Sequence, residues 1–237
     1  MDGKLYLAPV KQPKRVIDLA TGTGIWAIDF ADEHPDVELV LGNDLSPIQP
    51  SWVPPNVKFV VDDVESEWSY EKPFDFIHGR YLAGSISDWP KLMSQAYANL
   101  QSGGWVEFQD YDLNVRVDDN SLDGTVVAQL HDLICGACEK LGRTAAPGPK
   151  LKGWVEGAGF DNVKEVVYKL PLGPWTKDAK LKHAGGLNLS QCLSGLEAFT
   201  LRLFTSVLGW TTDEIHAFLV DARRDLNLKR IHPYMTL

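Results

Sequence analysis

Short apolar runs alternate with amphipathic stretches over the first half of the chain. Runs of the kind that forms buried strands occur at Arg15–Leu19, Val37–Leu41, Val57–Val61, Phe74–His78 and Trp105–Gln109. Helical spacing occurs at Ile25–Glu33 and again from Trp89 onward, where Gly103-Gly104 ends the pattern. The apolar positions of that second helix are Leu92, Met93, Ala96, Tyr97 and Leu100. This alternation predicts an α/β fold with a doubly wound, mostly parallel sheet and right-handed crossovers.

The second half of the chain has longer helical patterns. Helices are expected from Ser121, as the capping residue, to about Leu141, and over Leu151–Ala158, Ala179–Leu208 and Thr212–Leu226. Asn162–Lys169 alternates as a sixth strand would, and Thr211 with Glu214 is the signature of a capping box. We therefore expect one domain over 1–237, with the sheet in 1–112 and a helical cap formed by 113–160 and 175–230.

Charge and composition narrow the class of partner. The chain of 237 residues is 44% hydrophobic and 23% charged, which is ordinary for a globular protein. Its net charge of −9 argues against nucleic acid, because nucleic-acid binders usually carry a basic stripe. No apolar run approaches the roughly 20 residues of a membrane span, and Met1–Pro9 lacks the features of a signal peptide. We expect a cytoplasmic or nuclear protein that binds neither nucleic acid nor membrane.

The cysteines indicate a reducing compartment. An odd count of three is not a disulfide framework. Cys135 and Cys138 have the spacing of a metal-ligand pair, but neither a second pair nor a nearby pair of histidines completes a site. Because the pair also lies within a helical pattern, we expect no metal.

The first predicted strand leads directly into a turn of small residues. Val16–Gly24 reads V-I-D-L-A-T-G-T-G, and a helix is expected immediately behind it. Gly22 and Gly24 have no Cβ, so a ligand can approach the backbone N–H groups at this helix N-terminus. Asp44 follows the second strand, about 20 residues further on, where an acid can accept from both hydroxyls of a ribose. The carboxyl ends of parallel strands share one edge, so we expect the strand tips to converge there; they are residues 20–24, 43–44, 62–64, 78–80 and 109–111.

These features occur together with longer sequence words. Asp18-Leu-Ala-Thr-Gly-Thr-Gly24, Asp44, Asp63 and Leu100-Gln-Ser-Gly-Gly104 together resemble a class I S-adenosylmethionine-dependent methyltransferase. The words G-T-G-I-W-A-I-D-F-A, D-L-S-P-I-Q-P-S-W-V-P-P-N-V, F-D-F-I-H-G-R, D-W-P and S-L-D-G-T resemble its LaeA-like fungal branch, which is linked to secondary metabolism. Ala20 stands where the family has the first glycine of acid-x-G-x-G-x-G. Such proteins usually have a longer N-terminal segment and a last antiparallel strand, so we expect a trimmed chain or an incomplete final strand.

The resemblance assigns roles to the residues of the predicted edge. The methionine part of S-adenosylmethionine would lie against Asp18 and the turn residues Ala20, Thr21, Gly22 and Gly24. At the next tip, Asn43 would also bind the cofactor, and Asp44 would hold its ribose. Asp63 would accept from the adenine amino group, Val64 would contact the adenine ring through its backbone, and His78 would lie beside the sulfonium.

Methyl transfer from such a cofactor requires positioning, desolvation and removal of a proton from the acceptor, and no metal. Candidates for the base are His78, Glu107 and Tyr111, and for Glu107 a structural role tying the fifth strand to its neighbours is an equal alternative. An apolar acceptor pocket could be walled by Trp89, Tyr111 and Trp175.

Three functions are compatible with these patterns. The first is an enzyme that methylates an oxygen or nitrogen of a small metabolite. The second is a regulatory methyltransferase-like protein that acts through a protein partner with little or no turnover. The third is a nicotinamide-dependent reductase, because Gly22-x-Gly24-x-x-Ala27 also satisfies a loose dinucleotide fingerprint, although Asp18 and Leu100–Gly104 argue against it.

Overall fold

The computed structural model describes residues 3–237 and divides into two compact units. The unit named here the sheet unit contains the chain up to Leu82 together with Asp88–Gln109 and Leu151–Lys164. The helical unit contains Ala83–Ser87, Asp110–Lys150 and Glu165–Leu237. The segment assessed as a signal peptide, Met1–Pro9, begins with residues 1–2, which lie outside the described residues.

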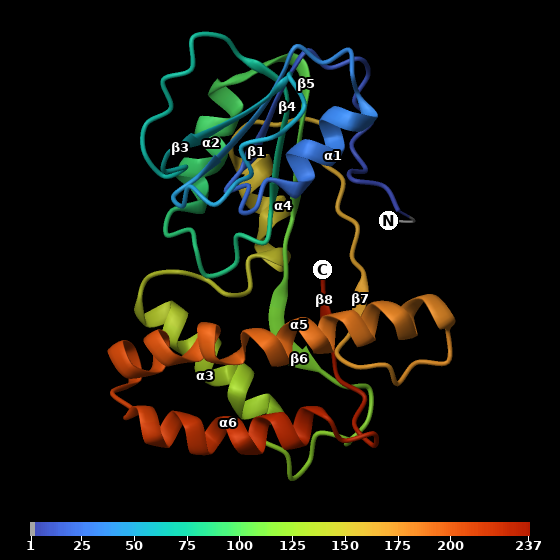
Figure 1. The fold of residues 1–237 in the computed structure, drawn as a ribbon, viewed down its shortest axis with the longest axis vertical. Coiled ribbons are helices and arrows are strands. Elements are labelled where there is room, and N and C mark those ends of the chain that lie inside the picture. The colour runs from blue at the N-terminus through green and yellow to red at the C-terminus, as the bar shows by residue number, and fades with distance from the viewer. Residues whose placement is uncertain (1–2) are drawn as a thin grey trace. The chain divides into compact units, whose positions relative to one another are not determined.

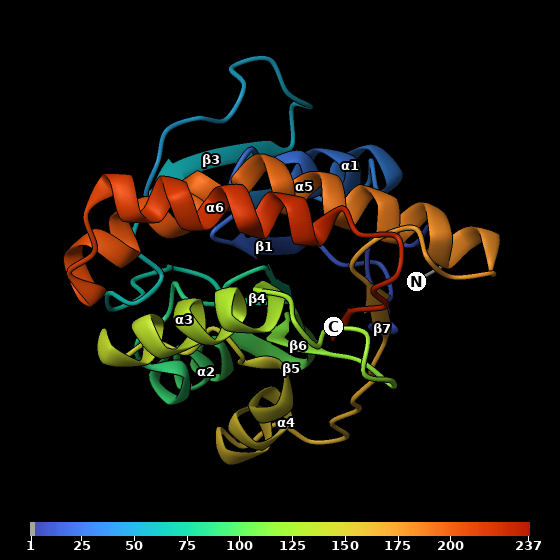
Figure 2. The same cartoon turned by 90° about the horizontal axis from the view of Figure 1, so that it is seen from below.

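The sheet unit is built on five parallel strands in the order β3-β2-β1-β4-β5. The strands are β1 (Arg15–Leu19), β2 (Leu39–Asp44), β3 (Val57–Val61), β4 (Phe74–Arg80) and β5 (Leu100–Gln109). Helix α1 (Ile25–Glu33) covers one face and α2 (Trp89–Ala98) the other, as Figures 1 and 2 show. The predicted doubly wound parallel sheet is therefore confirmed. The prolines of residues 46–55 predict a turn of helix followed by a rigid loop, whereas these residues form no helix.

Aromatic packing fixes α1 on the sheet. The helix buries Trp26, Ala27, Phe30 and Ala31 against strand residues that include Val16. The rings of Trp26 and Phe30 stack with centroids 4.9 Å apart. Burying a large apolar side chain contributes about 1.5–3 kcal/mol, so this face holds the helix N-terminus firmly beside the end of β1.

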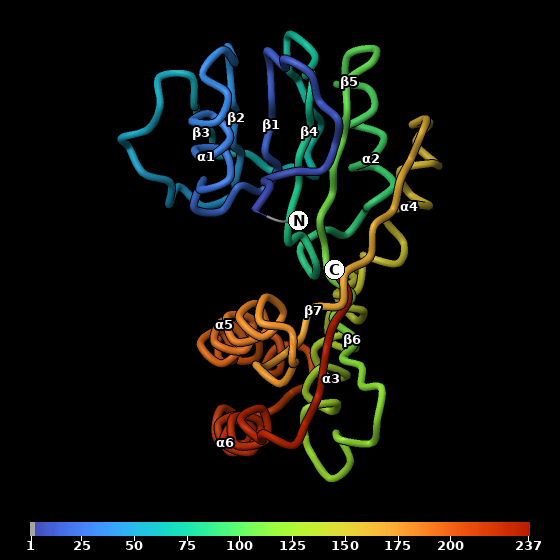
Figure 3. Tube along the Cα trace, turned by 90° about the vertical axis from the view of Figure 1, so that its right-hand side faces the viewer, coloured from blue at the N-terminus to red at the C-terminus, as the bar shows by residue number. Residues whose placement is uncertain are grey.

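The helical unit combines long helices with a small antiparallel sheet. Its elements are α3 (Val127–Lys140), α5 (Ala179–Leu203), a π-helix at Phe204–Leu208, α6 (Thr212–Leu226), β6 (Asp112–Arg116), β7 (Lys169–Pro171) and β8 (Tyr234–Thr236). Helices α5 and α6 lie side by side in opposite directions (Figures 1 and 3), and the strands pair in the order β6-β8-β7. The boundary between the units falls within α4 (Gly148–Gly157). Its residues up to Lys150 belong to the helical unit, and its residues from Leu151 belong to the sheet unit.

A second apolar core stabilises this unit. Its fully or nearly fully buried members are Val127, Leu130, Leu172, Leu196, Phe204, Ile215, Leu219, Ala222, Leu226, Ile231 and Met235. The predicted capping box is present at the start of α6, since Thr211 and Glu214 bond reciprocally to each other's backbone N–H. Local signals therefore set the first residue of α6 correctly.

Several expectations for the second half of the chain were wrong. Asn162–Lys169 is not a strand; only Lys169 enters a strand, the three-residue β7. Ser121 does not cap α3, which begins after Val126, whose N–H donates to the Asp225 carboxylate. The Ser121 hydroxyl oxygen instead accepts from the backbone N–H of His232. The short strand β6 was not expected, whereas a last antiparallel strand is present as the three-residue β8.

Boundaries also differ in the first half. The second helix ends at Ala98, and β5 begins at Leu100 rather than at Trp105. Tyr97 is half exposed instead of inward and packs edge-on against Phe160. Residues 151–164, which the sequence interpretation assigned in part to a helical cap, are grouped with the sheet unit. The assignment of the remaining segments to a substrate cap stays a prediction.

Candidate functional site

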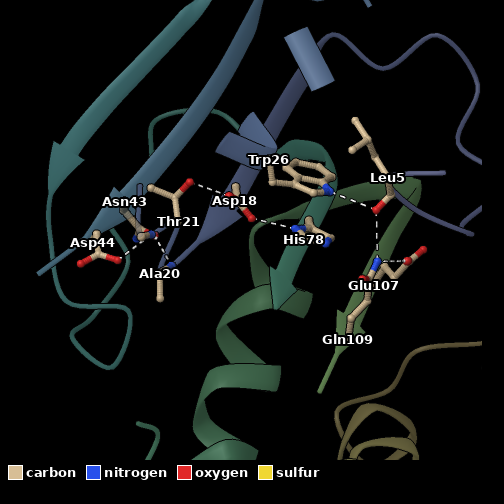
Figure 4. A network of polar contacts seen from close by, with 11 residues as sticks. Leu5, Asp18, Ala20, Thr21, Trp26, Asn43, Asp44, His78, Glu107 and Gln109 are labelled. Atoms are coloured by element: carbon tan, nitrogen blue, oxygen red, sulfur yellow. Dashed lines mark hydrogen bonds and ion pairs between the residues drawn. The ribbon is translucent and has the colours of Figure 1, made fainter. Parts of the chain in front are cut away.

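The turn after β1 is held from the end of β2. Its backbone has positive φ at Ala20 (48°), Gly22 (59°) and Gly24 (79°). The Ala20 N–H donates to the Asn43 side-chain oxygen at 3.2 Å, and the Thr21 N–H donates to the Asn43 carbonyl at 2.8 Å (Figure 4). Asn43 is fully buried, and these two hydrogen bonds fix the path of the turn; its contact with the cofactor stays a prediction.

The two glycines of the turn serve different ends. A Cβ on Gly24 would lie 2.3 Å from the Phe59 ring, so this position requires glycine for packing as well as for its φ. A Cβ on Gly22 would meet nothing within 4 Å. The turn is therefore packed on one side at Gly24 and borders open space at Gly22.

Asp44 connects the turn to the next two loops. Its Oδ2 accepts from the Gly22 N–H at 2.8 Å and its Oδ1 from the Ser46 N–H at 2.9 Å. Its carbonyl accepts from the Asp62 N–H at 3.1 Å, which brings the loop after β3 beside the end of β2. Each carboxylate oxygen has a second lone pair, so the side chain can still accept from a ligand.

The loop after β3 presents Asp63 and Val64 differently. Asp63 is exposed, and its Oδ1 accepts only locally, from the Glu65 N–H at 2.9 Å. Val64 is buried, and its carbonyl accepts from the Trp68 indole N–H at 2.9 Å. The structure thus brings the tips of β1, β2 and β3 together by hydrogen bonds.

A buried polar pair lies at the adjacent ends of β1 and β4. His78 Nδ1 is 2.7 Å from Asp18 Oδ1, and the Thr21 hydroxyl donates to Asp18 Oδ2 at 2.5 Å. The imidazole stacks on the Trp26 indole with centroids 3.8 Å apart and planes 4° apart (Figure 4). His78 is 0% exposed, and its Nε2 has no hydrogen-bond partner among residues 3–237. An orphaned buried nitrogen is uncommon in folded proteins and marks His78 as a candidate for a role beyond packing.

Glu107 binds the N-terminal segment of the chain. Its Oε2 accepts from the N–H groups of Leu7 at 2.7 Å and Ala8 at 2.6 Å, and its Oε1 accepts from the Gln109 amide at 2.6 Å. The Leu5 carbonyl in turn accepts from the Trp26 indole N–H at 3.0 Å (Figure 4). These contacts favour the structural role considered for Glu107 over that of a base.

The aromatic candidates do not all belong to one unit. Trp89 is 2% exposed and stacks on Trp154 within the sheet unit, as a core residue does. Tyr111 and Trp175 belong to the helical unit, where the Tyr111 carbonyl accepts from the Gly148 N–H at 3.1 Å. A shared acceptor pocket for these three side chains therefore stays a prediction, as does a catalytic role for Tyr111.

Two residues of the site had no assigned role from the sequence. Trp26 lies within the helix directly behind the turn, and no spacing rule separates a tryptophan that stacks on a histidine from one that fills the core. Gln49 lies in the proline-rich stretch, and its Nε2 donates to the Gly22 carbonyl at 2.6 Å. A polar residue among prolines, close after the ribose-type acid, is the signal that could have identified it.

The described residues show little sign of other site types. No group of three or more His, Cys, Asp or Glu within residues 3–237 could hold a metal ion. Cys135 is a free thiol, and burial raises its pKa to about 11, which makes it a poor nucleophile. Over the same residues, none of the helices combines the length and the apolarity needed to cross a bilayer.

Known proteins match most of the chain. A model of the methyltransferase domain family matches residues 1–165. The chain is 47% identical over 235 residues to methyltransferase pytC of Aspergillus terreus, covering 98% of this chain and 72% of that protein. It is 38% identical over 237 residues to the secondary metabolism regulator laeA of Monascus pilosus, covering 98% of this chain and 64% of that protein. Haemonchus contortus phosphoethanolamine N-methyltransferase 2 has a similar structure, with a TM-score of 0.52 at 18% identity over 97% of this chain and 49% of that one.

A parallel sheet with an acid-anchored glycine turn at its carboxyl edge defines a Rossmann-like protein that binds a nucleotide-type cofactor. The chain belongs to the methyltransferase domain family. The resemblance to class I S-adenosylmethionine-dependent methyltransferases, including the LaeA-like fungal branch, is thereby confirmed, and the nicotinamide alternative falls.

The residues present fit S-adenosylmethionine as the cofactor. Open space borders the turn at Gly22, and the Asp44 carboxylate next to it suits a ribose diol. The orphaned Nε2 of His78 supplies a further polar group at the same edge of the sheet. Which of these residues touches each part of the cofactor remains a prediction.

Proposed function

We propose that this methyltransferase transfers a methyl group to an oxygen or nitrogen of a small metabolite in fungal secondary metabolism. The observation that carries the proposal is the intact cofactor edge, in which Asp44 and Asn43 hold the glycine turn while open space borders Gly22. A protein that had lost the reaction would be free to fill this space with side chains. We also propose that the protein is located in the cytoplasm or the nucleus.

The residues of the edge divide the work between binding and proton removal. S-adenosylmethionine, when bound, supplies a methyl group on a sulfonium, which is a good leaving group. Asp18 and the turn from Ala20 to Gly24 hold its methionine part, and Asp44 holds its ribose. Asp63 and the backbone of Val64 hold its adenine.

His78 is our candidate for the base. Its Nδ1 is 2.7 Å from Asp18 Oδ1, which fixes the ring, so that Nε2 is the nitrogen left to accept a proton from the acceptor. Stacking on Trp26 keeps the ring in one plane. Glu107 is a weaker candidate, because both of its oxygens already accept hydrogen bonds. Tyr111 remains a third candidate.

A second function is favoured by two observations. The chain is 38% identical to a protein described as a secondary metabolism regulator, and α5 exposes large apolar side chains such as Leu187 and Phe199. A regulatory protein would use such a surface to bind a protein partner, with little turnover of a small molecule.

One assay separates the two functions. The purified protein is incubated with methyl-labelled S-adenosylmethionine and an extract of fungal metabolites, and cofactor binding is measured by calorimetry. We expect tight cofactor binding and a labelled small molecule, and we expect the label to be lost with His78→Ala. Tight binding with no labelled product would support the regulatory function, and absence of binding would contradict both.

A further inference from the structure

The glycine turn is held at Gly22 from a segment that forms no regular structure. Residues 46–55 contain neither helix nor strand, and within 45–50 only Gln49 is not exposed. Its side-chain Nε2 donates to the Gly22 carbonyl at 2.6 Å and to the Ser46 carbonyl at 2.9 Å. A side chain in a proline-rich loop therefore reaches back to the turn beside the open space.

Both backbone polar groups of Gly22 depend on side chains. The N–H donates to Asp44 Oδ2 at 2.8 Å, and the carbonyl accepts from Gln49. A backbone hydrogen bond from the Gly24 N–H to the Thr21 carbonyl, at 3.0 Å, closes the turn around Gly22, and the two side chains act in addition to it. Asp44 is also needed for the ribose, whereas Gln49 has no such second task.

The amide group is specifically suited to this position. The carbonyl oxygens of Gly22 and Ser46 both accept from Gln49 Nε2. This position therefore requires two N–H donors on one atom, which the glutamine amide supplies. A glutamate of the same shape would instead place a carboxylate against two carbonyl oxygens. A methionine of similar length would supply no donor.

We propose that Gln49 is a positioning residue, which holds the Gly22 peptide in the orientation that binds the methionine part of the cofactor. This inference rests on the proposed assignment of the turn to that part of S-adenosylmethionine. It adds a residue of the loop after β2 to those that determine the affinity for the cofactor. Because the exposed neighbours Leu45, Ile48 and Trp52 contribute little to a core, loss of Gln49 should affect the turn more than the fold.

The test compares affinities for S-adenosylhomocysteine and for adenosine, measured by calorimetry. In Gln49→Glu and Gln49→Met we expect S-adenosylhomocysteine to bind at least tenfold more weakly at pH 8, with adenosine affinity changed less than threefold. General damage to the site would weaken both ligands together. The matched control is Gln191→Ala, an exposed glutamine on α5, which should bind both ligands as the wild type does.

A pH series supplies the second readout. Protonation gives the glutamate of Gln49→Glu one donor, so its affinity relative to the wild type should recover severalfold between pH 8 and pH 5.5, while that of Gln49→Met should not. Unchanged S-adenosylhomocysteine affinity in both variants would overturn the role of Gln49. Failure of the wild type to bind S-adenosylhomocysteine would instead contradict the proposed function.

Discussion

Asp18 and His78 form a buried pair across neighbouring parallel strands, with Oδ1 and Nδ1 2.7 Å apart. Both side chains are almost completely buried, and the ring is flat against Trp26. The register that pairs Asp18 with His78 in the sheet therefore does two things at once. It satisfies the carboxylate at the glycine turn, and it leaves one imidazole nitrogen without a protein partner.

Replacing Asp18 should lower the free energy of unfolding. In Asp18→Ala the His78 Nδ1 loses its partner in a buried position, and an unsatisfied buried polar group costs about 1–3 kcal/mol. Asp18→Asn keeps one acceptor oxygen and should lose less. Urea unfolding of both variants measures the difference, and equal loss in the two would show that the hydrogen bond to His78 contributes nothing.

The two glycines of the turn should respond differently to alanine. Gly24→Ala places a Cβ against the Phe59 ring and strains a positive φ, whereas Gly22→Ala strains the backbone only. We expect Gly24→Ala to lose about 1–3 kcal/mol more in free energy of unfolding, the typical cost of overpacking.

Gly22→Ala should also lower the affinity for the cofactor. The methyl group of Gly22→Ala enters the open space, so S-adenosylhomocysteine should bind it at least tenfold more weakly than it binds the wild type. Wild-type affinity in Gly22→Ala would mean that the cofactor does not approach this side of the turn.

Glu107 should prove to be structural. Glu107→Ala removes the acceptor for the Leu7 and Ala8 N–H groups, so hydrogen exchange of these two amides should become faster. Glu107→Gln keeps an acceptor oxygen there and should retain methyl transfer within about threefold of the wild type. A loss of more than a hundredfold in Glu107→Gln, with both amides still protected, would identify Glu107 as the base instead.

The parts of the fold that the sequence predicts are those with local causes. The bounds of β1 and α1 match because an apolar run, a glycine turn and an amphipathic stretch follow one another without a gap. The start of α6 matches because Thr211 and Glu214 cap it within one turn. The family motif also places Asp44 at the end of its strand, beside the turn it anchors.

The parts that the sequence does not predict depend on contacts between distant residues. β6 pairs with β8, whose residues lie more than a hundred positions later, and the local sequence of β6 carries no sign of that partner. Ser121 resembles a helix cap, but its hydroxyl is used by the His232 N–H from the far end of the chain. Asn162–Lys169 alternates, yet Val166 and Val167 are both largely exposed, and residues 163–168 belong to no strand.

Acid should weaken the contact that holds the C-terminal strand to the loop before α3. His232 Nδ1 is 2.7 Å from Asp119 Oδ2, and this hydrogen bond, followed by those from Ser121, lowers the pKa of Asp119 to about 2. A folded-state pKa below the unfolded value of about 3.9 means that the stabilisation is complete above about pH 5 and is lost as the pH falls toward 2.

The urea midpoint of Asp119→Asn should therefore lie below that of the wild type at pH 7, and the difference between the two midpoints should narrow by pH 3. Asp123→Asn, which changes the formal charge equally on a nearby exposed turn, is the control and should show a smaller gap at pH 7. A gap for Asp119→Asn that stayed constant from pH 7 to pH 3 would show that the carboxylate charge is not what holds His232.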